Sequence, residues 1–405
     1  MARVKKAAET NTGTANNELA KKLDIIRKAA KKSNDFAGET VMGILGESDE
    51  LQEKLKIKFY PFPSEDLNEA TGGGFPKGKI TLIYGVEDSG KTSLMLEAIG
   101  KNMQNDPNLV ACWIETEKSL EAKFLTDVCK IDLNRFVYKE ISGDMTAEET
   151  INEIEGLIRA KAINICVINS LKMLIPQIEI TKKMEDVVVA EQARFNSRMM
   201  KKLTGILDGG ETALVLINHL TTSIGGGMPM RGGELLVGSG GKAIRYAAML
   251  TLDLRNASIN DSDPITKEEG KKIAVTIKKN HCVPHRNPYV KTYYYAVFGE
   301  GTEQVFTTLA KAIDRGIIVQ RGAWIFLVDE NGELSEENKW NGKRKFREDM
   351  IEHPEKLDMI KALVGKTYQD VSKAEIAELE KQEKEDKEEA DALMKAVEAA
   401  IEADE

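Results

Sequence analysis

Apolar and polar residues alternate along the middle of the chain in a pattern of short strands followed by amphipathic helices. The strand-like runs cover 80–84, 109–114, 136–141, 163–168, 212–217 and 249–254, with two more over 273–279 and 290–297. Helical periodicity occupies 92–103, 120–129, 147–160 and 186–207. Strands that alternate with helices favour an α/β fold built on a mostly parallel central sheet.

The two ends of the chain depart from this pattern. Residues 1–16 are polar and predict no stable structure, whereas 17–32 place apolar residues on one helical face among lysines. Beyond a glycine-rich turn the pattern predicts a small α/β unit with a helix over 305–314, a hairpin about 331–332 and a helix near 344–352. We divide the chain into a basic N-terminal arm (1–55), an α/β core (56–302), a small C-terminal domain (303–368) and a tail (369–405).

The net charge is unevenly distributed. The chain holds 57 basic and 66 acidic residues, a net charge of −9. Residues 369–405 contain 14 acidic and 5 basic residues, which accounts for the whole −9, and residues 1–32 contain 9 basic and 3 acidic residues, or +6. A basic arm and an acidic tail on a neutral body indicate a protein that handles polyanions, although the tail could equally be only a solubilising helix.

Hydropathy and cysteine usage exclude several classes of protein. With 41% hydrophobic residues the chain can bury a sizeable core, but no apolar run approaches the ~20 residues of a membrane helix. The N-terminal residues lead into no apolar segment, so we expect no secretory signal. Four widely spaced cysteines without a Cys-x-x-Cys pair argue against a disulfide framework or a zinc ribbon. We expect a cytoplasmic protein with no membrane partner.

The strongest chemical motif spans 85–92 and fits the phosphate-loop pattern G-x-x-x-x-G-K-[ST]. A hydrophobic strand precedes it and an amphipathic helix follows. Glycines allow backbone N–H groups to surround phosphate oxygens, and the helix N-terminus favours negative charge. Lys91 would reach the β- and γ-phosphates, and Thr92 would bind Mg²⁺ through its hydroxyl. The predicted nucleotide-binding residues here are Gly85, Val86, Glu87, Asp88, Ser89, Gly90, Lys91, Thr92 and Ser93.

Three further strand ends carry polar residues where ligands of such sheets bind. Glu117 could orient and deprotonate an attacking water. Asn169 stands where P-loop ATPases usually carry an acid that accepts hydrogen bonds from Mg²⁺-bound water; it keeps an acceptor oxygen and lacks the charge. His219 follows Asn218 at a third strand end and could sense a γ-phosphate. Taken singly, Glu117 and His219 also fit structural roles at a helix N-terminus and a strand end.

A glycine-rich run predicts a loop that orders on a ligand. Between 224 and 241, eight of 18 residues are glycine, a density that no packed element tolerates. Long loops within compact domains are usually functional. A companion loop at 177–189 precedes a helix whose basic residues recur at helical spacing, which could form a binding face or only a solvated one. The candidate ligand-binding residues are Lys182, Lys183, Arg194, Arg198, Gly225, Gly226, Gly227, Arg231, Gly240 and Gly241.

Together these motifs resemble the RecA family of DNA strand-exchange recombinases, colinearly from about 56 to 353. The resemblance implies a RecA-type P-loop ATPase core in which Glu117 is the catalytic glutamate and Phe124 stacks on adenine. Asn218 and His219 are similar to the family's signal-relay pair, with His in place of the bacterial Gln, as in the phage UvsX-like branch. Lys279 and His281 would contact ATP across a filament interface.

The resemblance also implies the roles of the other segments. The helix in the N-terminal arm would be a polymerisation helix, and the acidic tail a modulating one. The glycine-rich run and its companion would be DNA-binding loops. The cofactors would be ATP and Mg²⁺, and the partners single-stranded DNA, double-stranded DNA and further copies of this chain in a helical filament. If phage-encoded, the protein would act in the host cytoplasm.

The implied function is ATP-dependent homologous recombination and repair, by pairing and strand exchange on single-stranded DNA. Two alternatives stay open. Asn169 favours a catalytically weak accessory filament protein, because changes in the second shell of a metal cost ~10–100-fold in affinity or activity. The other alternative is a hexameric RecA-fold DNA motor, in which a closed ring replaces the filament.

Overall fold

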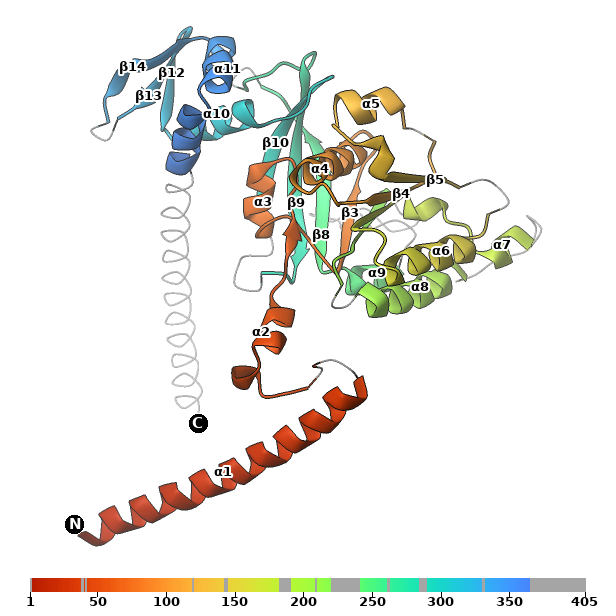
Figure 1. Cartoon of the computed structure of the whole chain (residues 1–405). Helices are drawn as coiled ribbons and strands as arrows, with labels where there is room; N and C mark the ends of the chain where they lie inside the picture. Colours follow the sequence, from red (N-terminus) through yellow and green to blue (C-terminus); the bar gives the residue numbers. More distant parts are fainter. Residues whose placement is uncertain are drawn as a thin grey trace, which may run out of the picture.

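The computed structural model describes residues 2–37, 40, 42–118, 120–141, 145–181, 191–207, 210–219, 241–260, 263–283, 290–329 and 332–364. Over these residues the chain forms a large twisted sheet with helices on both faces, a long N-terminal helix and a small C-terminal unit (Figure 1). The predicted fold class, α/β with a mostly parallel central sheet, is confirmed.

Nine strands form the central sheet within the described residues, in the order β11–β10–β9–β8–β3–β7–β6–β4–β5. The six strands from β8 to β5 are parallel, and β9, β10 and β11 extend the sheet with antiparallel pairings. The strands are β3 (Ile80–Gly85), β4 (Ala111–Glu115), β5 (Phe136–Glu140), β6 (Ile165–Asn169), β7 (Ala213–His219), β8 (Leu250–Ala257), β9 (Gly270–Asn280), β10 (Lys291–Val297) and β11 (Gly301–Glu303). β3, β4 and β6 are buried throughout, as parallel strands covered on both faces should be.

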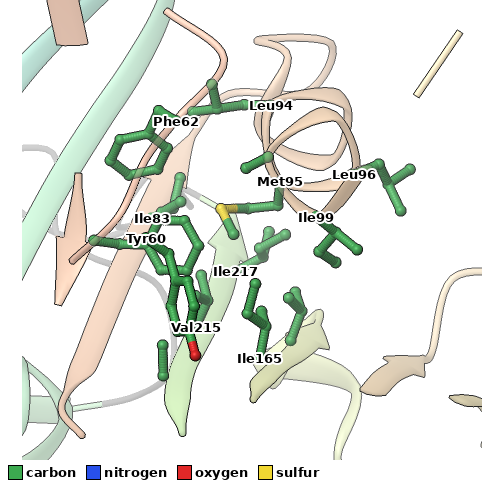
Figure 2. Close-up of a cluster of buried hydrophobic side chains, with 14 of the residues drawn as sticks. Tyr60, Phe62, Ile83, Leu94, Met95, Leu96, Ile99, Ile165, Val215 and Ile217 are labelled. Atoms are coloured by element: carbon green, nitrogen blue, oxygen red, sulfur yellow. The ribbon is translucent and has the colours of Figure 1, made fainter. Parts of the chain in front are cut away.

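One face of the sheet is covered by α3 (Glu65–Thr71), α4 (Lys91–Asn105) and α5 (Ala122–Asp127). Leu94, Met95 and Ile99 of α4 pack there against strand side chains such as Ile83 and Ile165 (Figure 2). Because side chains alternate between the faces of a strand, every second residue of each parallel strand points to the face that α3, α4 and α5 cover. This packing holds the start of α4 at the carboxyl ends of the strands.

The opposite face is covered by α6 (Ala147–Arg159), α8 (Glu191–Leu207) and α9 (Gly241–Ala247), which Figure 1 shows together away from α4. A capping box starts α6: the Thr146 hydroxyl accepts from the Glu149 backbone N–H, and the Glu149 carboxylate accepts from that of Thr146. Shorter helices lie at α7 (Gln177–Thr181), η2 (Leu133–Arg135) and η3 (Leu171–Met173).

The N-terminal segment consists of α1 (Ala2–Ala37), η1 (Leu45–Glu47) and α2 (Asp49–Leu55), and α1 lies apart from the sheet (Figure 1). The expectation of no stable structure over 1–16 was wrong, because α1 begins at Ala2. Four alanines and two lysines favour a helix over this stretch, and it continues without a break into the predicted helix over 17–32, so no separate nucleation is needed. A short pairing of β1 (Phe59–Tyr60) with β2 (Phe75–Pro76) leads into the core.

The C-terminal unit contains α10 (Gln304–Asp314), α11 (Lys343–Glu352), a helix over 354–364 and an antiparallel sheet of β12 (Ile318–Arg321), β13 (Trp324–Val328) and β14 (Leu334–Asn341). Its hydrophobic cluster includes Phe346 and Leu309, but also Ile265 and Tyr295 from the antiparallel side of the large sheet. The unit therefore packs directly on the core. The predicted tail, 369–405, lies outside the described residues.

A candidate nucleotide site at the carboxyl ends of the parallel strands

The phosphate loop leaves β3 at Gly85 and enters α4 at Lys91. At Gly85 a Cβ atom would lie 2.3 Å from the carbonyl oxygen of Leu254 and 2.6 Å from Oγ of Ser89. Gly90 has a φ of 82°, in the left-handed region where glycine carries no steric penalty. The two glycines that define the motif are therefore needed for close approach and for backbone conformation, respectively.

Lys91 folds back over the loop that precedes it. Its Nζ donates hydrogen bonds to the carbonyl oxygens of Val86 at 2.7 Å and Gly85 at 3.2 Å. The residue is only 4% exposed, and burial lowers the pKa of its ammonium group. No carboxylate among the described residues forms an ion pair with it. Lys91 is thus a buried cation whose hydrogen bonds go to neutral carbonyl groups, at the point where phosphate oxygens are predicted.

A cavity of about 1240 Å³ opens beside the loop. It is larger than the ~300–1,000 Å³ of ordinary small-molecule sites. The predicted residues that line it are Val86, Glu87, Asp88, Ser89, Gly90, Lys91, Thr92, Ser93, Glu117, Phe124 and His219. The fold therefore gathers residues from the loop after β3, the start of α4, the segment after β4, α5 and the end of β7 around one space.

Glu117 and His219 meet at this cavity. His219 Nε2 lies 2.6 Å from Glu117 Oε1. Because an ionised carboxylate only accepts hydrogen bonds, Nε2 carries the proton and donates it. The neighbouring Asn218 is buried and its Oδ1 accepts from the His219 backbone N–H at 3.0 Å. The predicted water activator and the predicted γ-phosphate sensor are therefore in direct contact.

Asn169 does not itself line the cavity, although the next residue, Ser170, does. Asn169 ends β6 in register with Glu115, the last residue of β4. Its Nδ2 lies 3.2 Å from Glu115 Oε2. Sequence reasoning did not identify Glu115 as a site residue; its only signal was a strand-end position two residues before Glu117.

The donor set fits Mg²⁺ that arrives with a nucleotide. Among the described residues, no group of three or more His, Cys, Asp or Glu side chains is arranged to hold a metal ion. Oxygen acceptors are nonetheless present: Thr92 lines the cavity, and Asn169 Oδ1 and Ser170 Oγ are buried without a hydrogen-bond partner in the described part of the chain. Mg²⁺ typically takes one or two protein oxygens and completes its shell with phosphates and water.

Among the cavity residues that the sequence analysis did not predict, Phe298 and Lys271 have side chains that could contact a nucleotide. Phe298 is 55% exposed and lines the cavity together with Phe124, so two aromatic rings are available to a planar base. Lys271 on β9 also lines it, and its Nζ donates to the carbonyl oxygen of Asp88 at 3.1 Å. Phe298 had a weak signal, its position just before Gly299. Lys271 had none, because its placement depends on the pairing of β9 with β8.

The structure does not bring Lys279 and His281 to this cavity. Lys279 Nζ donates to the carbonyl oxygens of Arg245 at 3.0 Å and Tyr246 at 3.1 Å, at the C-terminal end of α9. Burial lowers the pKa of Lys279. His281 is exposed, and its backbone N–H donates to Met249 at 2.9 Å.

Few of the predicted DNA-binding residues can be placed. Arg194 and Arg198 are exposed on α8, which covers the sheet face opposite α4, and Gly241 is the first residue of α9. The other predicted positions, Lys182, Lys183, Gly225, Gly226, Gly227, Arg231 and Gly240, lie outside the described residues.

The mostly parallel sheet with this loop defines the class as an α/β P-loop protein. A family model described as the RecA N-terminal domain matches residues 24–303, more than half of the chain. The chain belongs to the RecA family.

Individual relatives agree with this assignment. Protein RecA of Aquifex pyrophilus is 29% identical over 313 residues, which cover 77% of this chain and 84% of the relative. Protein RecA of Chlorobaculum parvum is 30% identical over 297 residues, covering 73% and 80% respectively. Protein RecA of Prochlorococcus marinus (strain AS9601) is 30% identical over 278 residues, covering 69% and 72%. Within the described part of the chain, no helix combines the length and apolarity needed to cross a membrane.

Proposed function

We propose that this chain is an ATP-dependent recombination and repair protein that assembles on single-stranded DNA and exchanges it with homologous double-stranded DNA. The observation that carries the proposal is the cavity of a RecA-family chain, in which the buried Lys91 lies beside the hydrogen-bonded Glu117 and His219. Buried cations and coupled titratable groups in a cavity are typical of functional sites.

Each residue then has a role in ATP hydrolysis. Lys91 binds the β- and γ-phosphates, and Thr92 holds Mg²⁺, which supplies charge neutralisation at the phosphates when bound. Phe124 stacks on the base. Glu117 accepts the proton of the attacking water; since His219 occupies only Oε1, its second oxygen remains available.

The contact between Glu117 and His219 also provides a route from nucleotide to DNA. A γ-phosphate that draws either side chain toward itself must change their 2.6 Å hydrogen bond. His219 is the last residue of β7, and the glycine-rich segment 224–241 follows within a few residues. The nucleotide state would therefore bias the conformation of the predicted DNA loop, which is a linkage between two sites.

Filament assembly supplies the remaining part of the site. Lys279 and His281 do not line the cavity of their own chain, so a neighbouring copy would have to present them to ATP. We assign the helix α1 to polymerisation and the acidic tail to modulation, with domain boundaries as predicted from the sequence. The phage UvsX-like branch stays a proposal that depends on Asn218 and His219.

ATP turnover with and without single-stranded DNA, at low and moderate salt, tests this function. We expect strong stimulation by DNA that falls steeply with salt, because Lys182, Lys183, Arg194, Arg198 and Arg231 would contact phosphates. A flat salt response would contradict the assignment of these residues.

The same measurement separates the second candidate, an accessory filament protein, which the uncharged Asn169 favours. That function predicts tight ATP and DNA binding with little turnover in either condition. Fast turnover without DNA, together with rings rather than filaments in electron micrographs, would instead indicate a hexameric motor.

A further inference from the structure

Glu115 is a fully buried carboxylate with no cationic partner among the described residues. It is 0% exposed. Its oxygens accept from Trp113 Nε1 at 2.9 Å, the Glu117 backbone N–H at 2.7 Å and Asn169 Nδ2 at 3.2 Å. Every one of these donors is neutral. A buried charge held only by neutral donors remains costly, which calls for an explanation beyond stability.

Glu115 and Asn169 point to the same face of the sheet as the start of α4. Side chains alternate along a strand, so Glu115 shares a face with Trp113, and Asn169 shares one with Val167. Trp113 and Val167 belong to the hydrophobic cluster that contains the α4 residues. The α4 helix begins with Lys91 and Thr92 at these same strand ends. The two side chains therefore lie on the nucleotide side of the sheet.

Their chemistry dictates how the Asn169 amide is turned. An ionised carboxylate accepts hydrogen bonds only, so Asn169 must present its NH₂ group to Glu115. The amide oxygen then faces away from β4, where it is buried and has no hydrogen-bond partner among the described residues. An aspartate at 169 would set two carboxylates against each other at the 3.2 Å contact.

We propose that Glu115 is a positioning residue of the nucleotide site, which orients the Asn169 amide and supplies from β4 the negative charge that position 169 lacks. Asn169 Oδ1 thereby becomes a fixed acceptor for water bound to the Mg²⁺ of a nucleotide. By accepting from the Glu117 backbone, Glu115 also holds the segment that carries the water activator. This inference depends on the proposed function, since it concerns the same nucleotide site.

The test measures binding rather than turnover. The dissociation constant of a fluorescent ATP analogue is determined in excess EDTA and in Mg²⁺, and the ratio of the two is the Mg²⁺ enhancement. In Glu115→Gln an NH₂ group at the Oε2 position can donate to Asn169, which lets the amide reverse, and it leaves Trp113 Nε1–H without its acceptor. We expect the Mg²⁺ enhancement to fall ~10-fold or more and the lost Trp113 hydrogen bond to lower the melting temperature. The Mg²⁺ enhancement of Asn169→Ala should fall by the same factor. That of the double variant E115Q/N169A should fall no further, because Glu115 acts through Asn169.

The charge-exchange variant E115Q/N169D is the decisive one. The amide introduced at position 115 would donate to the carboxylate introduced at position 169. The charge and the second oxygen of that carboxylate then face the site, so the enhancement should return to the wild-type value.

Asp263 provides a matched control for these variants. It is a buried acid that contacts Lys272 and Tyr295 and does not line the cavity. Asp263→Asn should lower the melting temperature and leave the Mg²⁺ enhancement unchanged.

Specific results would overturn the inference. One is an Mg²⁺ enhancement that is unchanged in Glu115→Gln or in Asn169→Ala. The other is an Mg²⁺ enhancement in E115Q/N169D that is no higher than in Glu115→Gln. Asn169→Ala and E115Q/N169D keep the test valid if Glu115→Gln alone does not fold. A wild-type chain that binds no ATP in Mg²⁺ would overturn the proposed function as well, whereas Mg²⁺-dependent binding that no variant alters would overturn this inference alone.

Discussion

Two regions of the large sheet differ in whether their buried and partly buried charged side chains form ion pairs. At the carboxyl ends of the parallel strands, Lys91 and Glu115 are buried, hydrogen-bonded to neutral groups and, among the described residues, without an ion pair. Around the antiparallel side and the C-terminal unit, charges with little exposure are paired, as in the partly buried Lys311 with the partly buried Asp66, and the partly buried Lys272 with the buried Asp263.

We infer from this difference that the paired charges stabilise the fold and that the unpaired buried charges serve the candidate site. Removing one partner of such an ion pair leaves the other charge without a counter-ion, which is destabilising. The paired ions therefore help to hold α3, α10 and β9 in place. For Lys91, the cost of burial without a counter-ion would be recovered when an anionic ligand binds. Unpaired buried charges therefore lie at the end of the sheet where we propose that the nucleotide binds.

The largest expected effect is that of Lys91→Met, which keeps the length of the side chain and removes its charge. ATP turnover should fall by ~10³-fold or more, since the phosphates lose their main cationic contact. The melting temperature should change little, because relief of the desolvation that lowers the pKa of Lys91 offsets the loss of its hydrogen bonds to Val86 and Gly85. Turnover and thermal melts check both parts; a large loss of stability would mean that Lys91 is structural.

In the region where charges are paired, the matching substitution is Lys311→Met on α10. It should lower the free energy of unfolding by up to ~3–5 kcal/mol, because Asp66, whose side chain is only 14% exposed, would lose its ion-pair partner. Denaturant melts measure this, and ATP binding should be unchanged. Lys361→Met is the control: its partner Glu65 is half exposed, so a loss of less than ~1 kcal/mol is expected.

Glu117→Gln should reduce ATP turnover by ~10²-fold while ATP binding is retained. Glutamine keeps an oxygen that accepts from His219, so the geometry is preserved and only the base is lost. Single-turnover kinetics with a binding isotherm provide the measurement. Unchanged turnover would remove Glu117 as the water activator.

A smaller, pH-dependent effect is expected at Asp263. Burial alone would raise the pKa of its carboxyl, but hydrogen bonds from Lys272, Tyr295 and the Asn260 backbone together lower it below the ordinary 3.8. This stabilisation is present above pH 3.8 and is lost as pH falls through the lowered value. The stability gap between wild type and Asp263→Asn should therefore shrink in acid, as followed by melts from pH 7 to pH 3. A constant gap would contradict the ion-pair role.

The smallest effect concerns the cysteines, all four of which are buried. Burial raises the pKa of Cys282 to about 12. Since the thiolate is the nucleophile, labelling of Cys282 in the native protein should stay slow as pH rises from 7 to 9, whereas unfolded protein should react faster over the same range. Mass spectrometry of alkylated peptides distinguishes the two.

The sequence by itself determined the order of strands and helices, the phosphate loop and the polar strand ends. Hydrophobic periodicity and glycine spacing are local properties, so strands such as β3 and β6 and the loop at Gly85 could be predicted. The start of α1 was predicted too late, because helix propensity can act without an apolar face.

Tertiary structure alone decided which of these residues meet. The order of strands in a sheet is not encoded locally, and it is this order that sets Glu115 beside Asn169 and brings Lys271 to the loop. The same holds for Lys279, which caps α9 in its own chain, and for Tyr295, which joins the C-terminal cluster. Each of these contacts depends on long-range packing that fixes strand neighbours and excludes water from between them.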